Sequence, residues 1–170
     1  MVFLFLADIM IDGIYLLLGT NLGDKKYNLS QAKALINKQV GVIINQSNTY
    51  ETAAWGITEQ PSFLNAVIEI KSELTPEQML LKINEIEAEM GRVRKEKWGE
   101  RLIDIDILYY QHQIHTSDEL QIPHPGIPYR RFTLIPLVEL NAEFIHPVLN
   151  KTNQQLLEQC EDSLEVKKVR

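Results

Sequence analysis

The sequence has a single cysteine, Cys160, so the chain cannot form an internal disulfide and offers no cysteine pair for a zinc site. It also has no apolar run of the about 20 residues that a transmembrane helix requires. Basic residues are in the minority, with 17 Lys and Arg against 23 Asp and Glu and a formal net charge of −6. This balance argues against a general nucleic-acid-binding protein, which needs a basic face to gather phosphates. It does not exclude a local basic site for a small phosphorylated ligand.

The rest of the composition is that of an ordinary globular protein. Of the 170 residues, 45% are hydrophobic and 24% are charged, which excludes a disordered or fibrous chain. We expect one domain at this length, and a location in the reducing cytoplasm fits the single cysteine. The first residues are apolar but have no basic flank, so residues 1–12 are expected to form an N-terminal appendage and residues 13–170 a single domain. A tail that touches a membrane is the alternative for the appendage.

Apolar periodicity predicts strands and helices along most of the chain. Strands are predicted at residues 14–18, 42–51, 63–71 and 102–110, with a turn at residues 19–24. Helices are predicted through residues 29–36, 76–90, 134–140 and 153–160. The second helix has a capping hydroxyl at Thr75 and a proline, Pro76, in its first turn, and Gly91 ends it.

The order of the first six elements is β-α-β-β-α-β, which is the order of the split βαβ arrangement. We therefore predict an α+β fold with a ferredoxin-like core, in which an antiparallel sheet is backed by helices. The last two helices are expected to be extra C-terminal elements.

Asp104 and Asp106 form the most specific local pattern in the chain. Because side chains alternate between the two faces of a strand, both carboxylates point one way while Ile105 points the other. Carboxylates side by side repel each other unless a cation compensates them, and such hard oxygen ligands suit Mg²⁺ held together with substrate phosphates. The alternative is an amphipathic strand whose polar face is simply solvated.

A basic segment precedes this pair. Its cations are Arg92, Arg94, Lys95, Lys97 and Arg101. The planar guanidinium of arginine can form two hydrogen bonds to phosphate oxygens. A basic segment beside the aspartates is therefore suited to phosphoryl transfer from a nucleotide. A solvated charge run is the alternative, but it leaves Trp98 unexplained. The chain has no Gly-x-x-x-x-Gly-Lys-[Ser/Thr] loop, so arginine, histidine and a metal would have to hold the phosphates.

Other residues are candidate contacts to a ligand. His124 lies between two prolines that stiffen its backbone, and Arg130 follows it, so this segment can either contact phosphate or simply pack. Aromatic rings can enclose a flat heterocycle, while an amide, which is both donor and acceptor, forms hydrogen bonds with the edge of the heterocycle. The candidates for such a pocket are Trp55, Phe63, Asn65, Trp98 and Phe132. The alternative is that these aromatic residues belong to the core.

Several of these motifs occur in a specific order. They are Gly91-Arg92-Val93-Arg94, Trp98-Gly99-Glu100-Arg101, Asp104-Ile105-Asp106 and Ile122-Pro123-His124-Pro125, preceded by the segments 15–21 and 60–65. From about residue 14 to about residue 136, the chain closely resembles the 6-hydroxymethyl-7,8-dihydropterin pyrophosphokinase family of folate synthesis. The resemblance implies the ferredoxin-like fold. It also implies a reaction in which the β,γ-pyrophosphoryl group of ATP passes to the pterin hydroxymethyl oxygen and AMP is released.

The resemblance further implies roles for single residues. Asp104 and Asp106 would hold two Mg²⁺ ions that bridge the triphosphate, and Asp104 would be nearest to receiving the hydroxyl proton. With these two aspartates, Arg92 and Arg101 would complete the catalytic set. The residues implied at the nucleotide are Glu87, Arg92, Arg101, His124 and Arg130. The residues implied at the pterin are Thr52, Trp55, Phe63, Asn65, Trp98 and Phe132.

The sequence thus predicts an ATP- and Mg²⁺-dependent diphosphokinase that acts on small molecules as a monomer, without nucleic-acid or membrane partners. Two other classes are open. One is a pterin- or nucleotide-binding module that has lost catalysis, although a pure binder has no need of a metal-binding pair. The other is a generic ferredoxin-like interaction domain, which would leave Asp104, Asp106 and Trp98 unexplained.

Overall fold

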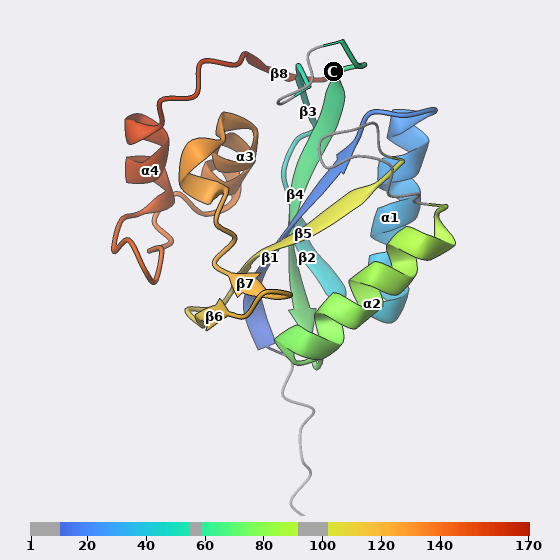
Figure 1. Ribbon diagram of the computed structural model, residues 1–170, viewed down its shortest axis with the longest axis horizontal. Helices are drawn as coiled ribbons and strands as arrows, with labels where there is room; N and C mark the ends of the chain where they lie inside the picture. The colour runs from blue at the N-terminus through green and yellow to red at the C-terminus, as the bar shows by residue number, and fades with distance from the viewer. Residues whose placement is uncertain (1–10, 55–58, 92–101) are drawn as a thin grey trace, which may run out of the picture.

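The computed structural model describes residues 11–54, 59–91 and 102–170. Its central layer is an antiparallel β-sheet with a pair of helices on each face (Figure 1). The helices are α1 (Lys25–Gln39), α2 (Pro76–Glu89), α3 (Arg131–Asn141) and α4 (Asn153–Gln159), with a short 3-10 helix, η1 (Ile127–Tyr129), before α3. Helices α1 and α2 cover one face of the sheet, and α3 and α4 cover the other.

The central sheet is formed by strands from both ends of the described chain. Its strands are β1 (Ile11–Thr20), β2 (Val42–Gln46), β3 (Tyr50–Thr52), β4 (Phe63–Ser72), β5 (Asp104–Tyr110) and β8 (Val166–Lys168). They are ordered β5-β1-β4-β3-β8, while β2 also pairs with β4, and every pairing is antiparallel. A separate small ribbon consists of β6 (His115–Thr116) and β7 (Gln121–Ile122). Among the described strands, β5 therefore lies at one edge of the sheet.

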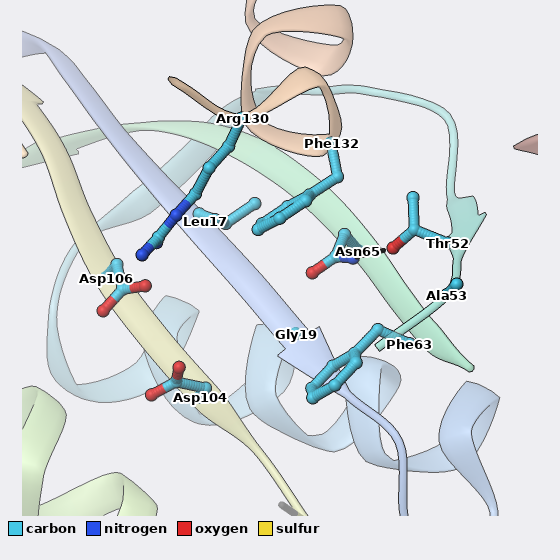
Figure 2. Close-up of a pocket in the computed structure, with 10 residues that line it drawn as sticks. All are labelled: Leu17, Gly19, Thr52, Ala53, Phe63, Asn65, Asp104, Asp106, Arg130 and Phe132. Atoms are coloured by element: carbon cyan, nitrogen blue, oxygen red, sulfur yellow. Dashed lines mark hydrogen bonds between the residues drawn. The ribbon is translucent and has the colours of Figure 1, made fainter. Parts of the chain in front are cut away.

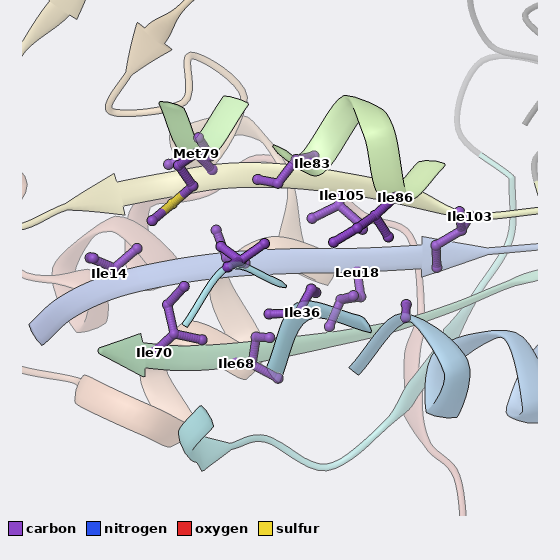
Figure 3. Close-up of a cluster of buried hydrophobic side chains, with 14 of the residues drawn as sticks. Ile14, Leu18, Ile36, Ile68, Ile70, Met79, Ile83, Ile86, Ile103 and Ile105 are labelled. Atoms are coloured by element: carbon purple, nitrogen blue, oxygen red, sulfur yellow. The ribbon is translucent and has the colours of Figure 1, made fainter. Parts of the chain in front are cut away.

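The larger hydrophobic core fills the space between the sheet and the helices α1 and α2 (Figure 3). Asp24 caps α1 by accepting a backbone N–H of its first turn at 3.0 Å, and Thr75 begins α2 with a capping box. Leu18 of the sheet and Ile36 and Ile83 of the helices are almost completely buried. Each side chain buried in this way stabilises the fold by roughly 1.5–3 kcal/mol.

A second, smaller core lies between the opposite face of the sheet and the helices α3 and α4. At its centre, the ring of Phe144 packs on Tyr109 at 4.4 Å and on Tyr15 at 5.6 Å between centroids. The Tyr109 hydroxyl donates to the Asn153 side chain at 2.9 Å, which gives both buried polar groups a partner. This core fixes the C-terminal helices on the sheet.

The structure confirms the predicted elements and corrects some of their bounds. The strand predicted at residues 42–51 is divided into β2 and β3, because the Ser47 hydroxyl replaces a backbone carbonyl and accepts the N–H of Val67 at 2.9 Å. The turn predicted from residue 19 begins later, since β1 continues to Thr20. No sequence pattern predicts β8, because only its pairing with β3 makes this polar segment a strand.

The prediction of an α+β fold with an antiparallel sheet, helices and extra C-terminal elements is confirmed. β1 already begins at Ile11, ahead of the domain start expected at residue 13. Residues 1–10 lie outside the described residues, so the division into an appendage and a domain stays a prediction. Within the described ranges, no helix is long and apolar enough to cross a bilayer.

Glu139 of α3 joins that helix to the segment that contains β3. Its carboxylate accepts the backbone N–H of Asn48 at 3.0 and 3.1 Å, the Asn48 side-chain amide, and the Tyr50 hydroxyl at 2.9 Å. Burial, together with the bond to Glu139, raises the pKa of Tyr50 to about 12. A single acceptor thus serves several donors.

Replacement of Glu139 by Ala is expected to lower the free energy of unfolding by about 1–2 kcal/mol, because charge-assisted hydrogen bonds are lost at a solvent-exposed position. Urea denaturation at neutral pH measures this loss. The same change should lower the pKa of Tyr50, which tyrosinate absorbance reports once Tyr50→Phe has assigned the signal. Glu143→Ala, at an exposed glutamate just beyond the same helix, is the control. Equal losses in the two variants would contradict the role given to Glu139.

His146 stabilises the turn before α4 in its neutral form. Its Nδ1 accepts the backbone N–H groups of Val148 at 3.2 Å and Leu149 at 3.1 Å, so this nitrogen carries no proton. The ring is buried against Tyr109, and burial lowers the pKa of His146. Protonation of the ring therefore opposes the folded state.

Stability is expected to fall as the pH drops below the ordinary histidine pKa of about 6.5, because the unfolded chain then binds a proton that folded His146 resists. His146→Asn keeps an acceptor oxygen for the turn but does not titrate. Its urea midpoint should therefore fall less than that of the unchanged protein between about pH 7 and pH 5. The urea midpoints of the two proteins are also compared near pH 8, where His146 is neutral in the folded and the unfolded state. Any difference there measures the effect of the substitution on packing. An identical pH dependence of the two proteins would show that His146 is not the titrating group.

Candidate active site

A pocket opens where the C-terminal end of β1 lies beside the N-terminal end of β5, next to the start of α3 (Figure 2). Its lining consists of Leu17, Gly19, Thr52, Ala53, Phe63, Asn65, Asp104, Asp106, Arg130 and Phe132. The fold thus brings carboxylates, a cation, an amide and aromatic rings together from distant parts of the sequence.

The carboxylates of Asp104 and Asp106 face this pocket from the first half of β5. The alternation predicted for the strand is confirmed, because Ile105 between them is 4% exposed and belongs to the core on the α2 side. Their partners across the ladder in β1 are Gly19 and Leu17, which have no polar side chain. Both aspartates are half-buried, so their oxygens can reach a ligand in the pocket.

This pair fits a magnesium site that is completed by substrate. Mg²⁺ usually binds one or two protein carboxylates and fills its shell with water and phosphate oxygens. In the described part of the chain, no group of three or more His, Cys, Asp or Glu side chains gathers to hold an ion. With their carboxylates on one face of β5, Asp104 and Asp106 could hold magnesium jointly with oxygens of a bound phosphate.

His124 lies beside Asp106, with 3.9 Å between its Nε2 and a carboxylate oxygen. Its ring is oriented because Nδ1 accepts the backbone N–H of Gly126 at 2.9 Å. Burial first, and then the nearby Arg130, lower the pKa of His124 to about 4, against the opposing effect of Asp104. At neutral pH the contact with Asp106 is therefore not an ion pair. The neutral ring carries its proton on Nε2, where it can be donated to an anionic ligand.

Arg130 brings a positive charge to the pocket. Figure 2 shows its guanidinium pointing to the side of the pocket where Asp106 lies. The guanidinium carbon lies 5.9 Å from the ring centroid of Phe132. It also packs over Gly126, where an added Cβ atom would come within 2.8 Å of it. The glycine therefore leaves room for an arginine whose planar fork matches phosphate oxygens.

Asn65 presents an oriented amide to the other end of the pocket. The residue is 4% exposed, and its Nδ2 donates to the Thr52 hydroxyl at 3.2 Å. Its Oδ1 lies over Gly19, where an added Cβ atom would come within 2.8 Å of this oxygen. Figure 2 shows the rings of Phe63 and Phe132 on opposite sides of the pocket. The arrangement can enclose a flat ring and bind its edge through hydrogen bonds.

A second cavity adjoins the pocket at Asp106, which lines both. The other residues of this cavity are Leu80, Ile105, Ile107, Asp118, Glu119, Leu120, Gln121, His124 and Pro125. It combines apolar side chains of α2 and β5 and the ring of His124 with three acidic residues. Asp106 can therefore contact a ligand in either cavity.

Some of the predicted site residues lie outside the described part of the chain, namely Trp55, Arg92, Trp98 and Arg101. Glu87, which the resemblance assigns to the nucleotide, lies in α2 and is 4% exposed. Its Oε1 accepts the backbone N–H of Ile105 at 2.8 Å. The structure therefore places this carboxylate against the backbone of β5.

The pocket also contains residues that the sequence analysis missed. Leu17 and Gly19 line it from β1, and Ala53 lines it beyond β3. The period-2 pattern of β1 puts Leu17 and Gly19 on one face, and this was the available signal for them. The prediction placed Gly19 in a turn, however, and the apolar Ala53 carries no signal for a site.

Much of the chain is similar in sequence to known pyrophosphokinases. Residues 15–142 match the model of a family described as 7,8-dihydro-6-hydroxymethylpterin-pyrophosphokinase (HPPK). The 2-amino-4-hydroxy-6-hydroxymethyldihydropteridine pyrophosphokinase of Aquifex aeolicus is 41% identical over 139 residues, which cover 81% of this chain and 86% of that protein. The Bacillus subtilis protein of the same name is 39% identical over 127 residues, covering 74% and 76% of the two chains.

Longer proteins contain a similar part. The folic acid synthesis protein FOL1 of Dictyostelium discoideum is 40% identical over 143 residues, which are 84% of this chain and 22% of that protein. In a crystal structure of Plasmodium falciparum HPPK-DHPS, the matching region has a TM-score of 0.74 at 20% identity and covers 90% of this chain and 46% of the other, which supports the fold alone. Because the family model spans most of the chain and the shorter relatives are similar along most of their length, the chain belongs to the HPPK family, the pyrophosphokinases that transfer pyrophosphate to hydroxymethyldihydropterin in folate synthesis.

Proposed function

We propose that this chain transfers the β,γ-diphosphate of ATP to the hydroxymethyl oxygen of 6-hydroxymethyl-7,8-dihydropterin and releases AMP. The pterin oxygen forms a bond to the β-phosphorus, the bond from that phosphorus to the oxygen bridging the α-phosphate breaks, and the hydroxyl proton is removed. The observation that carries the proposal is that Asp106 lines both cavities, so two ligands can react beside the aspartate pair.

The aromatic pocket is assigned to the pterin. Phe63 and Phe132 can pack on the two faces of a flat ring, and Asn65, oriented by Thr52, can bind its edge. Figure 2 shows the Asn65 amide across the pocket from the carboxylates, next to Thr52. A ring that is held at the amide can therefore direct its hydroxymethyl group toward Asp104.

The second cavity, together with Arg130 of the first pocket, is assigned to ATP. The planar guanidinium of Arg130 can form two hydrogen bonds to phosphate oxygens. The Nε2–H group of neutral His124 can donate a hydrogen bond to a further phosphate oxygen. Asp104 and Asp106 would hold magnesium, for which we propose two ions. Bound magnesium would neutralise the charge on the phosphates and polarise the reacting phosphorus.

Asp104 is assigned as the residue that receives the hydroxyl proton. It lines the aromatic pocket and is absent from the described lining of the second cavity, whereas Asp106 lines both. This difference favours Asp104 as the carboxylate that faces the pterin. Four further assignments rest on the family resemblance, and these are Arg92 and Arg101 at the phosphates and Trp55 and Trp98 at the pterin.

We also propose a ferredoxin-like core, a monomeric state and a cytoplasmic location for this chain. The ferredoxin-like core is supported by the order β5-β1-β4-β3, in which each helical crossover skips one strand. The proposed substrates are small molecules. The chain is proposed to act on them as a monomer in the cytoplasm.

Asp104→Asn is expected to reduce AMP release by a factor of about 100 or more, because it removes a metal ligand and proton acceptor while preserving the side-chain shape. AMP production that requires both Mg²⁺ and the hydroxymethyl-pterin is the measurement. Asp12→Asn, at an exposed aspartate at the end of β1 away from the pocket, is the matched control and should have little effect. Unchanged turnover of Asp104→Asn would rule out the proposed function of this carboxylate.

Gly19→Ala is expected to raise KM for the pterin roughly tenfold with little change in KM for ATP, because the new methyl group displaces Oδ1 of Asn65. Steady-state kinetics with each substrate varied in turn tests this. In the double variant Gly19→Ala/Asn65→Ala, the defect should be no greater than in Asn65→Ala alone, since the displaced group is gone. Additive losses would show that Gly19 acts independently of Asn65.

A further inference from the structure

Glu87 is a buried carboxylate outside the described lining of both cavities. Glutamate is almost never fully buried unless it has a partner. Here Oε1 accepts the backbone N–H of Ile105 at 2.8 Å, and Ile105 is the residue between Asp104 and Asp106. The bond thus connects α2 to the stretch of backbone from which both carboxylates project.

The location of this bond matters because β5 is an edge strand. Only β1 pairs with β5 in the described sheet, so the outward backbone groups of β5 have no partner in the ladder. Glu87 provides one such partner at Ile105. Further along the strand, the Leu108 carbonyl accepts the backbone N–H of His124 at 2.9 Å. Helix α2 and the segment at His124 therefore form hydrogen bonds with outward backbone groups of β5 that would otherwise pair with a neighbouring strand.

We propose that Glu87 is a positioning residue, which fixes the carboxylates of Asp104 and Asp106 through the backbone of Ile105. Because both side chains leave the strand next to Ile105, a twist or shift of this backbone would move the two of them together. A catalytic arrangement has to be held to about 0.5 Å. The ladder holds β5 on one side only, so contacts on its outer edge help to set the position of its backbone. This inference rests on the proposed function, since it takes the aspartates as ligands of magnesium and phosphate.

The acceptor atom and the negative charge of Glu87 can be separated by substitution. Gln keeps an acceptor oxygen at the same position and removes the charge, whereas Asp keeps the charge and withdraws the oxygen from Ile105. Met keeps the length of the side chain and removes both. If Glu87 works through its bond to Ile105, Gln should rescue function and Asp should not. A residue that acts through its charge would give the opposite order.

The experiment compares Glu87→Gln, Glu87→Asp and Glu87→Met with the unchanged protein. Amide hydrogen exchange at Ile105 is measured by NMR without substrate, and the affinity for a non-hydrolysable ATP analogue with Mg²⁺ is measured by calorimetry. In the Asp and Met variants we expect exchange at Ile105 to accelerate and affinity to fall, each by roughly tenfold, while Gln stays within about threefold. Should the Met variant not fold, the contrast between Gln and Asp decides.

Glu85 provides a matched control on the same helix, because it is exposed and its carboxylate pairs with Lys82 at 2.8 Å. Glu85→Gln and Glu85→Asp should change neither measurement. The proposal is overturned if Gln loses affinity while Asp retains it, or if affinity falls without any change at the Ile105 amide. Failure of the unchanged protein to release AMP would instead count against the proposed function, because neither measurement depends on turnover.

Discussion

The candidate site depends on the alternation of side chains along β5. Burial of Ile105 in the core on the α2 side turns Asp104 and Asp106 to the opposite face, where the pocket lies. The same apolar burial that stabilises the fold therefore keeps two like charges side by side, although they repel each other. The guanidinium of Arg130, which points to the side of the pocket where Asp106 lies, and a bound cation can both offset this repulsion.

The other walls of the pocket depend on the order of the strands. β1 lies between β5 and β4, so the bare backbone at Gly19 separates the carboxylates from Asn65 and leaves room for the amide oxygen. Helix α3, which begins beside Phe132, is joined through Glu139 to the segment that leads to Thr52. The contacts that shape this part of the pocket thus reach well beyond the residues that line it.

Patterns that depend on near neighbours could be predicted from the sequence. The capping hydroxyl of Thr75 and the alternation around Ile105 are such patterns, because capping and strand geometry act over a few residues. The break between β2 and β3 could not be predicted, since it requires the Ser47 hydroxyl to meet Val67 on another strand. The short strand β8 likewise exists only through its pairing with β3.

The sequence by itself determined the carboxylate pair, the order of the main elements and the resemblance to a pyrophosphokinase family. These follow from residue type and spacing alone. Only the tertiary structure decided that Asn65 is oriented by Thr52, that His124 stays neutral beside Asp106, and that the Glu87 carboxylate meets the backbone of β5. Such features arise from desolvation and from contacts between remote segments, which become defined when the chain packs and are not encoded in any local pattern.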